Sequence, residues 1–114
     1  MSRSGREYLQ HILDETNYLL QVSANITLAH FLADETLKRA FVRSLEIIGE
    51  AVKQLPEELR QKYAHVSWRS MAAMRDRLIH GYFGVDYDIV WDVVIRHIPQ
   101  LRKDILAILS QEYS

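Results

Sequence analysis

The feature that most limits the possible folds is a long apolar stripe in the middle of the chain. Its members follow one another at steps of four, four, three, four and three residues: Leu37, Phe41, Leu45, Ile48, Val52 and Leu55. This spacing matches the 3.6-residue period of an α-helix and places all of them on one face. Asp34 is a suitable N-cap, and Pro56 ends the pattern because proline cannot continue a helix. The stripe therefore predicts a long helix that buries one side in a core.

Weaker patterns of the same kind lie on either side of this stripe. Before it, apolar residues recur at roughly helical spacing from Arg6 onward, and the pattern weakens at residues 23–25. After it, Pro56 is followed by Glu57 and Glu58, which is typical of a helix start because acidic side chains favour the positive end of the helix dipole. We therefore expect one more long helix before the stripe and a short helix after it.

The C-terminal part of the chain carries two further helical patterns. Ser67 can cap a helix that runs through Ile79, and a turn bounded by glycines follows at residues 81–84. From residue 86 or 88 another apolar pattern begins and continues past Pro99. The sequence leaves open whether this proline kinks one helix or begins a new one.

Turn-forming residues are scarce, which argues against a β-fold. The chain of 114 residues has four glycines and two prolines, too few for the many turns of a sandwich or barrel. A chain of this length holds one core comfortably, so residues 1–114 are expected to form a single domain. The predicted fold is all-α, an antiparallel up-and-down helical bundle of four main helices plus a short one.

The absence of cysteine excludes a disulfide framework, a thiolate zinc site and a cysteine nucleophile, and it agrees with a reducing cytoplasm. The first residues show no signal-peptide pattern. The longest uncharged run, residues 16–33, is interrupted by many polar side chains and is too polar to span a membrane. We therefore expect a cytoplasmic protein with no membrane contact.

The charge is unevenly distributed although its total is only −1. Residues 59–80 hold five basic and one acidic side chain, whereas residues 1–58 hold six and nine, and residues 81–114 hold three and five. A net charge near zero argues against coating nucleic acid by bulk electrostatics. The basic segment is either a solvated helix face or the local surface that meets an anionic partner.

Most familiar site motifs are missing, so candidates must come from the histidines. There is no His-Glu-x-x-His, no Glu-x-x-His and no phosphate-binding glycine loop, and no acidic or histidine cluster has the spacing of a metal site. We therefore expect no cofactor and no bound metal. A lone histidine on a helix usually has a structural role. His80 differs, because it lies inside the basic segment where a helix meets a glycine-bounded turn.

The segment around His80 carries a recognisable motif, Arg75-x4-His80-x-Tyr82. The Arg-x4-His spacing also begins at Arg6 and at Arg60, but only the copy at Arg75 has a tyrosine two residues after the histidine. Further matching features are residues 44–51, Trp68, residues 75–87 and Trp91. In these features, which extend over nearly the whole chain, the protein resembles HEPN-domain ribonucleases, specifically the HepT-like toxins of bacterial and archaeal HepT/MntA toxin–antitoxin pairs.

The resemblance implies a HEPN fold, a homodimer with its site at the interface, and an endoribonuclease that acts as the toxin of a type VII toxin–antitoxin system. It implies Arg75 and His80 as catalytic residues, and RNA as the substrate, with tRNA as one candidate. It also implies that an MntA-type nucleotidyltransferase antitoxin attaches AMP to Tyr82. An ordinary packing or hydrogen-bonding role is the alternative for this tyrosine.

The chemistry of RNA cleavage agrees with these residue types. Without a metal, the reaction needs a base for the 2′-hydroxyl proton, an acid for the leaving 5′-oxygen and a cation on the phosphate. Imidazole can take either proton-transfer role near neutral pH, and guanidinium matches phosphate oxygens. One chain supplies one such histidine, whereas a two-fold dimer that joins the Arg75 and His80 regions supplies two.

Four neighbouring residues remain candidates for RNA contact or for support of the site. Arg77 either touches RNA or pairs with an acid, and Asp76 pairs with a base on the surface or in the partner chain. Glu46 and Glu50 lie one turn apart, where either could hold Arg75 or simply face solvent. The alternative function is a catalytically silent HEPN module that binds a nucleotidyltransferase partner or a nucleotide through the same basic surface.

Overall fold

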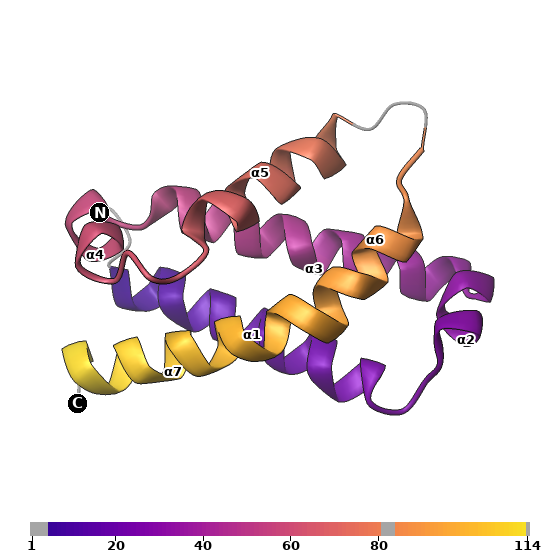
Figure 1. Ribbon diagram of the computed structural model, residues 1–114, viewed down its shortest axis with the longest axis horizontal. Coiled ribbons are helices and arrows are strands. Elements are labelled where there is room, and N and C mark those ends of the chain that lie inside the picture. Colours follow the sequence, from indigo (N-terminus) through magenta and orange to yellow (C-terminus); the bar gives the residue numbers. More distant parts are fainter. Residues whose placement is uncertain (1–4, 81–83, 114) are drawn as a thin grey trace.

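The computed structural model describes residues 5–80 and 84–113, and all regular structure in these ranges is helical, as predicted (Figure 1). The elements in chain order are α1 (Gly5–Ser23), α2 (Leu28–Ala33), α3 (Glu35–Gln54), α4 (Glu57–Lys62), α5 (Trp68–Ile79), α6 (Tyr87–Asp92), a π-helical turn η1 (Val93–His97) and α7 (Ile98–Tyr113). In Figure 1, α1 and α5 run in one direction, and α3 and the segment from α6 to α7 run in the other.

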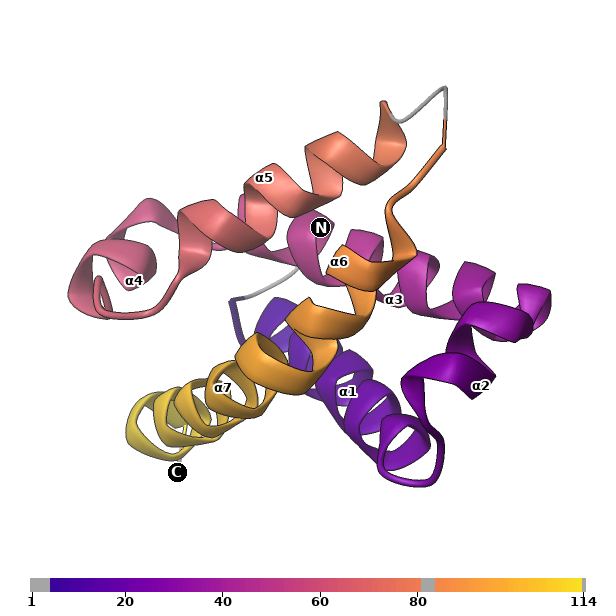
Figure 2. The same cartoon turned by 45° about the vertical axis from the view of Figure 1, so that its right-hand side comes forward.

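Helix α3 contains the apolar stripe and lies between α1 and α5 (Figure 2). Its start is capped as predicted, because a side-chain oxygen of Asp34 accepts the backbone N–H of Leu37 at 3.0 Å. It ends where Leu55 turns to extended backbone before Pro56. The prediction of this helix is confirmed at both ends.

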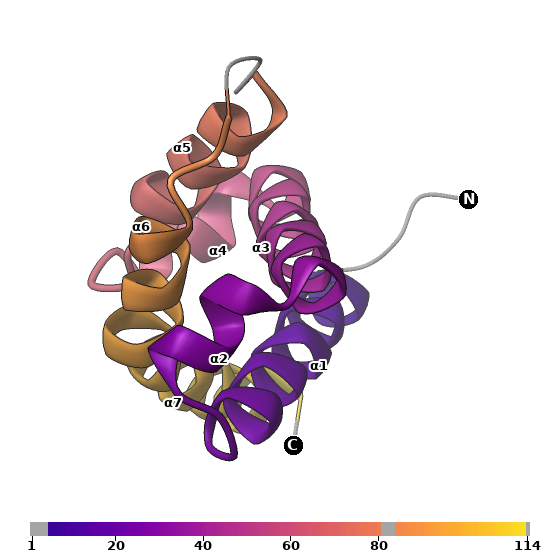
Figure 3. The same ribbon diagram turned by 90° about the vertical axis from the view of Figure 1, so that its right-hand side faces the viewer.

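The core lies in the space that α1, α3, α6 and α7 surround, which Figure 3 shows in a view from one end. Its largest fully buried side chains come from all four of these helices and from α2: Leu9, Ile12, Leu19, Phe31, Phe41, Leu45, Ile48, Val52, Val90, Ile98, Ile105 and Ile108. Burying one such side chain contributes about 1.5–3 kcal/mol. Two buried hydroxyls have hydrogen-bond partners. Thr16 donates to the carbonyl of Leu13 at 2.8 Å, within α1, and Ser44 on α3 donates to Glu15 on α1 at 2.8 Å.

Helix α2 is a second short helix that the sequence patterns did not predict. Thr27 caps it by accepting the backbone N–H of His30 at 3.1 Å. Its one buried side chain, Phe31, packs against the rings of Phe41 and Trp91, with centroid distances of 4.9 and 5.3 Å. The helix thus lies across one end of the fold and closes the core there (Figure 3).

Pro99 neither ends a helix nor begins a separate one, which answers the question that the sequence left open. The backbone N–H of Ile98 bonds to the carbonyl of Val93, five residues earlier, so the turn before the proline is a π-helical turn. This wider turn makes room for the proline ring, which would clash with a carbonyl of a regular α-helix. The chain therefore continues from α6 through η1 into α7 as one long curved helix.

Within the described ranges, none of the helices combines the length and the apolar character that crossing a membrane requires.

Candidate active site

The candidate residues of the motif gather at the C-terminal end of α5, where Arg75, Asp76 and Arg77 occupy the last turns and His80 is the C-cap. Tyr82 lies outside the described residues. At the other end of the helix, Ser67 occupies the predicted N-cap position, but its side chain makes no capping hydrogen bond. The start is held instead by Trp68, whose buried indole N–H donates to the carbonyl of Tyr63 at 3.0 Å.

The position of Arg75 depends on the close approach of α3 to α5 at Gly49. A Cβ atom on Gly49 would lie 2.2 Å from the Cβ of Arg75 and 2.9 Å from the carbonyl oxygen of Met71. Such distances are far inside van der Waals contact, so only a residue without a side chain fits. Helices α3 and α5 therefore approach each other closely at Gly49, and Arg75 is the residue of α5 that lies against this glycine.

We expect Gly49→Ala to destabilise the protein and to move Arg75. Alanine favours a helix over glycine by about 1 kcal/mol. The clash involves a backbone carbonyl and a Cβ, neither of which can rotate away, and overpacking of this kind costs about 1–3 kcal/mol or more. The net effect is a loss of stability, measurable as a lower urea midpoint. Unchanged stability would show that α5 shifts freely on α3.

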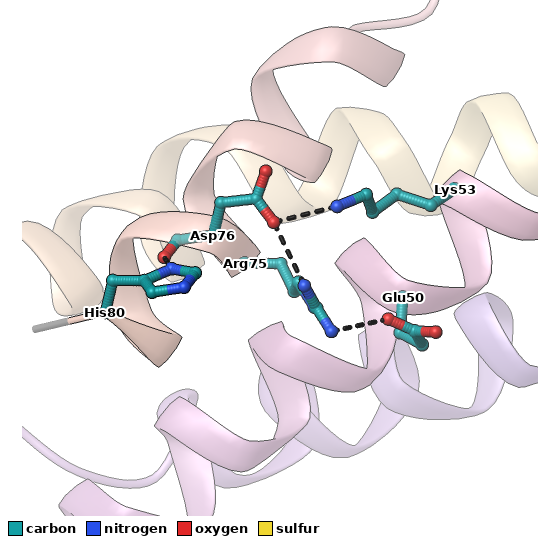
Figure 4. A network of polar contacts seen from close by, with 5 residues as sticks. All are labelled: Glu50, Lys53, Arg75, Asp76 and His80. Atoms are coloured by element: carbon teal, nitrogen blue, oxygen red, sulfur yellow. Dashed lines mark hydrogen bonds and ion pairs between the residues drawn. The ribbon is translucent and has the colours of Figure 1, made fainter.

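Two carboxylates hold the guanidinium of Arg75 (Figure 4). Its Nη2 lies 2.9 Å from Oε2 of Glu50 on α3, and its Nη1 lies 3.0 Å from Oδ1 of Asp76 on its own helix. The same Asp76 oxygen accepts a hydrogen bond from Nζ of Lys53 on α3 at 2.9 Å. Glu50, Asp76 and Lys53 thus fix a side chain that remains one quarter exposed.

The carboxylate of Asp76 stays charged at neutral pH. Hydrogen bonds from Lys53 and Arg75 lower the pKa of Asp76 below its usual value. A carboxyl with a lowered pKa contributes its stability above the ordinary aspartate pKa and loses it as the pH falls through the lowered value. The contact between Asp76 and Arg75 therefore weakens only in acid.

The structure distinguishes the two glutamates that the sequence left equivalent. Glu50 contacts Arg75, whereas Glu46, one turn earlier on α3, makes no ion pair with any residue in the described ranges. Asp76 pairs with two basic side chains on the surface of its own chain, as predicted. Lys53 was missed. Its only sequence signal is the position one turn after Glu50, which has meaning only once the contact between α3 and α5 is known.

His80 is exposed, and among the described residues its ring has one hydrogen bond, between Nδ1 and the backbone carbonyl of Asp76 at 2.8 Å. A carbonyl oxygen can only accept, so Nδ1 carries the proton in this contact. In the neutral ring the lone pair is then on Nε2. This arrangement leaves Nε2 as a base directed away from the backbone of α5.

Arg75 and His80 of one chain do not converge on one point. Five residues along an α-helix turn by about 500°, so the two side chains leave the helix about 140° apart. Figure 4 shows the guanidinium directed towards α3 and the imidazole beside the backbone of α5. The arrangement supplies a fixed cation and a base on different sides of one helix end.

Arg77 points away from Arg75, as its spacing predicted. It is exposed and makes no ion pair with the described acidic residues, so the alternative of pairing with an acid is not seen. It lines a pocket of about 390 Å³ between α5 and η1, together with Ser70, Met74 and His97. Its guanidinium is therefore available to a ligand or to a second chain.

No group of three histidine or acidic side chains is placed to hold a metal ion within residues 5–80 and 84–113.

Comparison with known proteins gives one family and several relatives. The model of the family described as "Ribonuclease HepT-like" matches residues 12–108. A protein of Caldanaerobacter subterraneus subsp. tengcongensis named "Putative RNase" is 50% identical over 96% of this chain and 98% of its own length. One of Methanocaldococcus jannaschii with the same name is 44% identical, over 92% and 87% of the two chains. A "Probable ribonuclease HepT" of Thermococcus cleftensis is 40% identical, over 90% and 93%. No solved structure matches this chain significantly.

Proposed function

We propose that this chain, which belongs to the HepT-like ribonuclease family, is a metal-independent endoribonuclease and the toxin of a toxin–antitoxin pair. The observation that carries the proposal is the end of α5. There Arg75 is held by Glu50 and Asp76, and the hydrogen bond to Asp76 leaves Nε2 of His80 as the free base. Cation and base are the groups that cleavage of RNA by its own 2′-hydroxyl requires.

In this mechanism Nε2 of His80 removes the proton of a 2′-hydroxyl, and the resulting oxygen attacks the adjacent phosphorus. The bond from phosphorus to the 5′-oxygen breaks, and that oxygen receives a proton from an imidazolium. The products are a 2′,3′-cyclic phosphate and a 5′-hydroxyl. Arg75 binds the phosphate oxygens, on which negative charge increases in the transition state.

The second imidazole comes from a second copy of the chain. Among the described helices, α5 packs extensively only against α3, and a pocket separates it from η1. Exposed apolar side chains lie at the end of α5 and along α6 and η1: Ile79, Ile89 and Ile95. A two-fold dimer that covers this surface brings two copies of the end of α5 together, with one histidine as base and the other as acid.

Cleavage should persist in excess chelator, since protonation and charge stabilisation both come from side chains. The test is cleavage of labelled RNA with and without EDTA, followed by analysis of the 3′ ends, which should carry a 2′,3′-cyclic phosphate or its hydrolysis product. Loss of cleavage in EDTA with the fold intact would contradict the mechanism. A chain that binds a nucleotidyltransferase or a nucleotide but never cleaves RNA would be the silent module instead.

A further inference from the structure

A groove between α1 and α3 lies next to Arg75 and has no role in the mechanism above. It holds a pocket of about 210 Å³ lined by Tyr8, His11, Arg43, Ile47, Glu50 and Ala51. Glu50, the ion-pair partner of Arg75, forms the wall nearest to α5. The pocket and the guanidinium are thus separated by one side chain.

The size and lining of the pocket suit one flat ring. Sites that enclose a whole small molecule usually measure roughly 300–1,000 Å³, so this one admits only part of a larger ligand. Tyr8 lines the pocket with a half-buried aromatic ring, and Ile47 and Ala51 add apolar side chains to the lining. Every nucleobase has a face that can stack on such a ring.

Positive charge lies beside the pocket on the exposed face of α3. Arg43 lines it, and Arg39 stands one turn earlier on the same face. Neither forms an ion pair with any acidic residue in the described ranges, in contrast to Lys38 and Lys53 on the same helix. The negative charge of Glu50 is already balanced by Arg75, so it does not oppose an incoming phosphate.

We propose that this groove is an RNA subsite in which a nucleotide adjacent to the cleaved phosphate stacks its base on Tyr8 and binds its own phosphate through Arg43. The inference rests on the proposed function, because it assumes that the cleaved phosphate sits on Arg75. A single strand then runs from the end of α5, past Glu50, into the groove between α1 and α3. The subsite contributes affinity and not proton transfer.

The test measures binding of a fluorescent single-stranded 2′-O-methyl hexanucleotide, which lacks the attacking hydroxyl and cannot be cleaved. Tyr8→Leu, which keeps an apolar side chain but removes the ring, should weaken binding about tenfold with an unchanged dependence on salt. Arg43→Gln should also weaken binding and reduce the slope of log affinity against log salt by about 0.7. Lys103→Gln removes one exposed charge on α7, away from the groove, and should bind as the wild type does.

The outcomes separate this proposal from the proposed function. Wild-type affinity in both groove variants, with unaltered thermal unfolding, would overturn the subsite even if the protein cleaves RNA. Equal weakening by Lys103→Gln would also overturn it, because the effect would then be general electrostatics. Failure of the wild type to cleave natural RNA, with selective loss of binding in the groove variants, would reject the ribonuclease and retain the subsite.

Discussion

His80→Ala should lower the rate of RNA cleavage by on the order of 10²-fold or more, because the variant lacks both the base and its symmetry-related acid. Arg75→Ala should cost a similar factor, since it removes the fixed cation from the transition state. The measurement is the single-turnover rate with end-labelled RNA near neutral pH. Growth arrest on expression of the wild-type chain, relieved by either substitution, is the cellular counterpart.

The chain offers a matched control for these variants. His65 follows Arg60 at the same spacing as His80 follows Arg75. It is exposed, and its closest acidic contact is Asp104 at 4.0 Å. His65→Ala should therefore cleave at the wild-type rate. A His80→Ala chain that folds and keeps full activity would contradict the assignment of the base.

A mixed dimer tests whether the site is shared. When a wild-type chain is paired with a His80→Ala chain, a composite cleft contains one imidazole where two are required. Its activity should then fall well below half of the wild-type value. Half of the activity would show that each chain works alone, and a monomer in sedimentation at micromolar concentration would remove the shared site altogether.

Tyr82→Phe should prevent the neutralisation by an antitoxin that the proposed function implies. We expect the wild-type chain, co-expressed with a cognate nucleotidyltransferase that uses ATP and Mg²⁺, to gain one or more AMP units on Tyr82 and to lose cleavage. The phenol oxygen bonds to the α-phosphorus of ATP and pyrophosphate leaves. The attached group adds bulk and negative charge two residues after His80, where it blocks RNA and neutralises Arg75. Phenylalanine lacks the oxygen, so toxicity should persist.

Intact-mass analysis after co-expression distinguishes modification from simple binding. Tyr113→Phe alters an exposed tyrosine on α7 and should still be modified and silenced, which makes it the matched control. If the wild-type chain is fully inhibited but carries no added mass, inhibition comes from complex formation. Tyr82 would then have only an ordinary packing role.

The long helices could be predicted from the sequence because each presents a regular apolar face to the core. Asp34 and Pro56 even gave both ends of α3 correctly. Helix α2 could not be predicted in this way. It has six residues and buries one side chain, Phe31, so it offers no repeat to detect. The π-helical turn before Pro99 could not be predicted either. The sequence shows Pro99 only as a helix breaker, whereas the backbone accommodates it by widening one turn.

The sequence indicated the candidate residues of the site but not the side chains that hold Arg75. Arg75 and His80 are candidates because of their residue types, the local charge and the motif by which the sequence resembles the family. The choice between Glu46 and Glu50 needs the register of α3 against α5. That register depends on Gly49, where the informative feature is an absent side chain. Lys53 follows from the same register and has no independent signal.

Because α5 packs against little besides α3 in its own chain, the activity of the proposed dimer should depend on the concentration of the chain. In a single chain this helix rests mainly on α3, with a pocket on its η1 side. In the proposed dimer, the second chain would complete the packing of the helix that carries Arg75 and His80, in addition to supplying the second imidazole. By mass action, active enzyme then increases with the square of monomer concentration while monomers predominate. In the proposed function, a few newly translated chains would therefore stay monomeric and inactive, and cleavage would rise steeply as the chain concentration approaches the dimer dissociation constant.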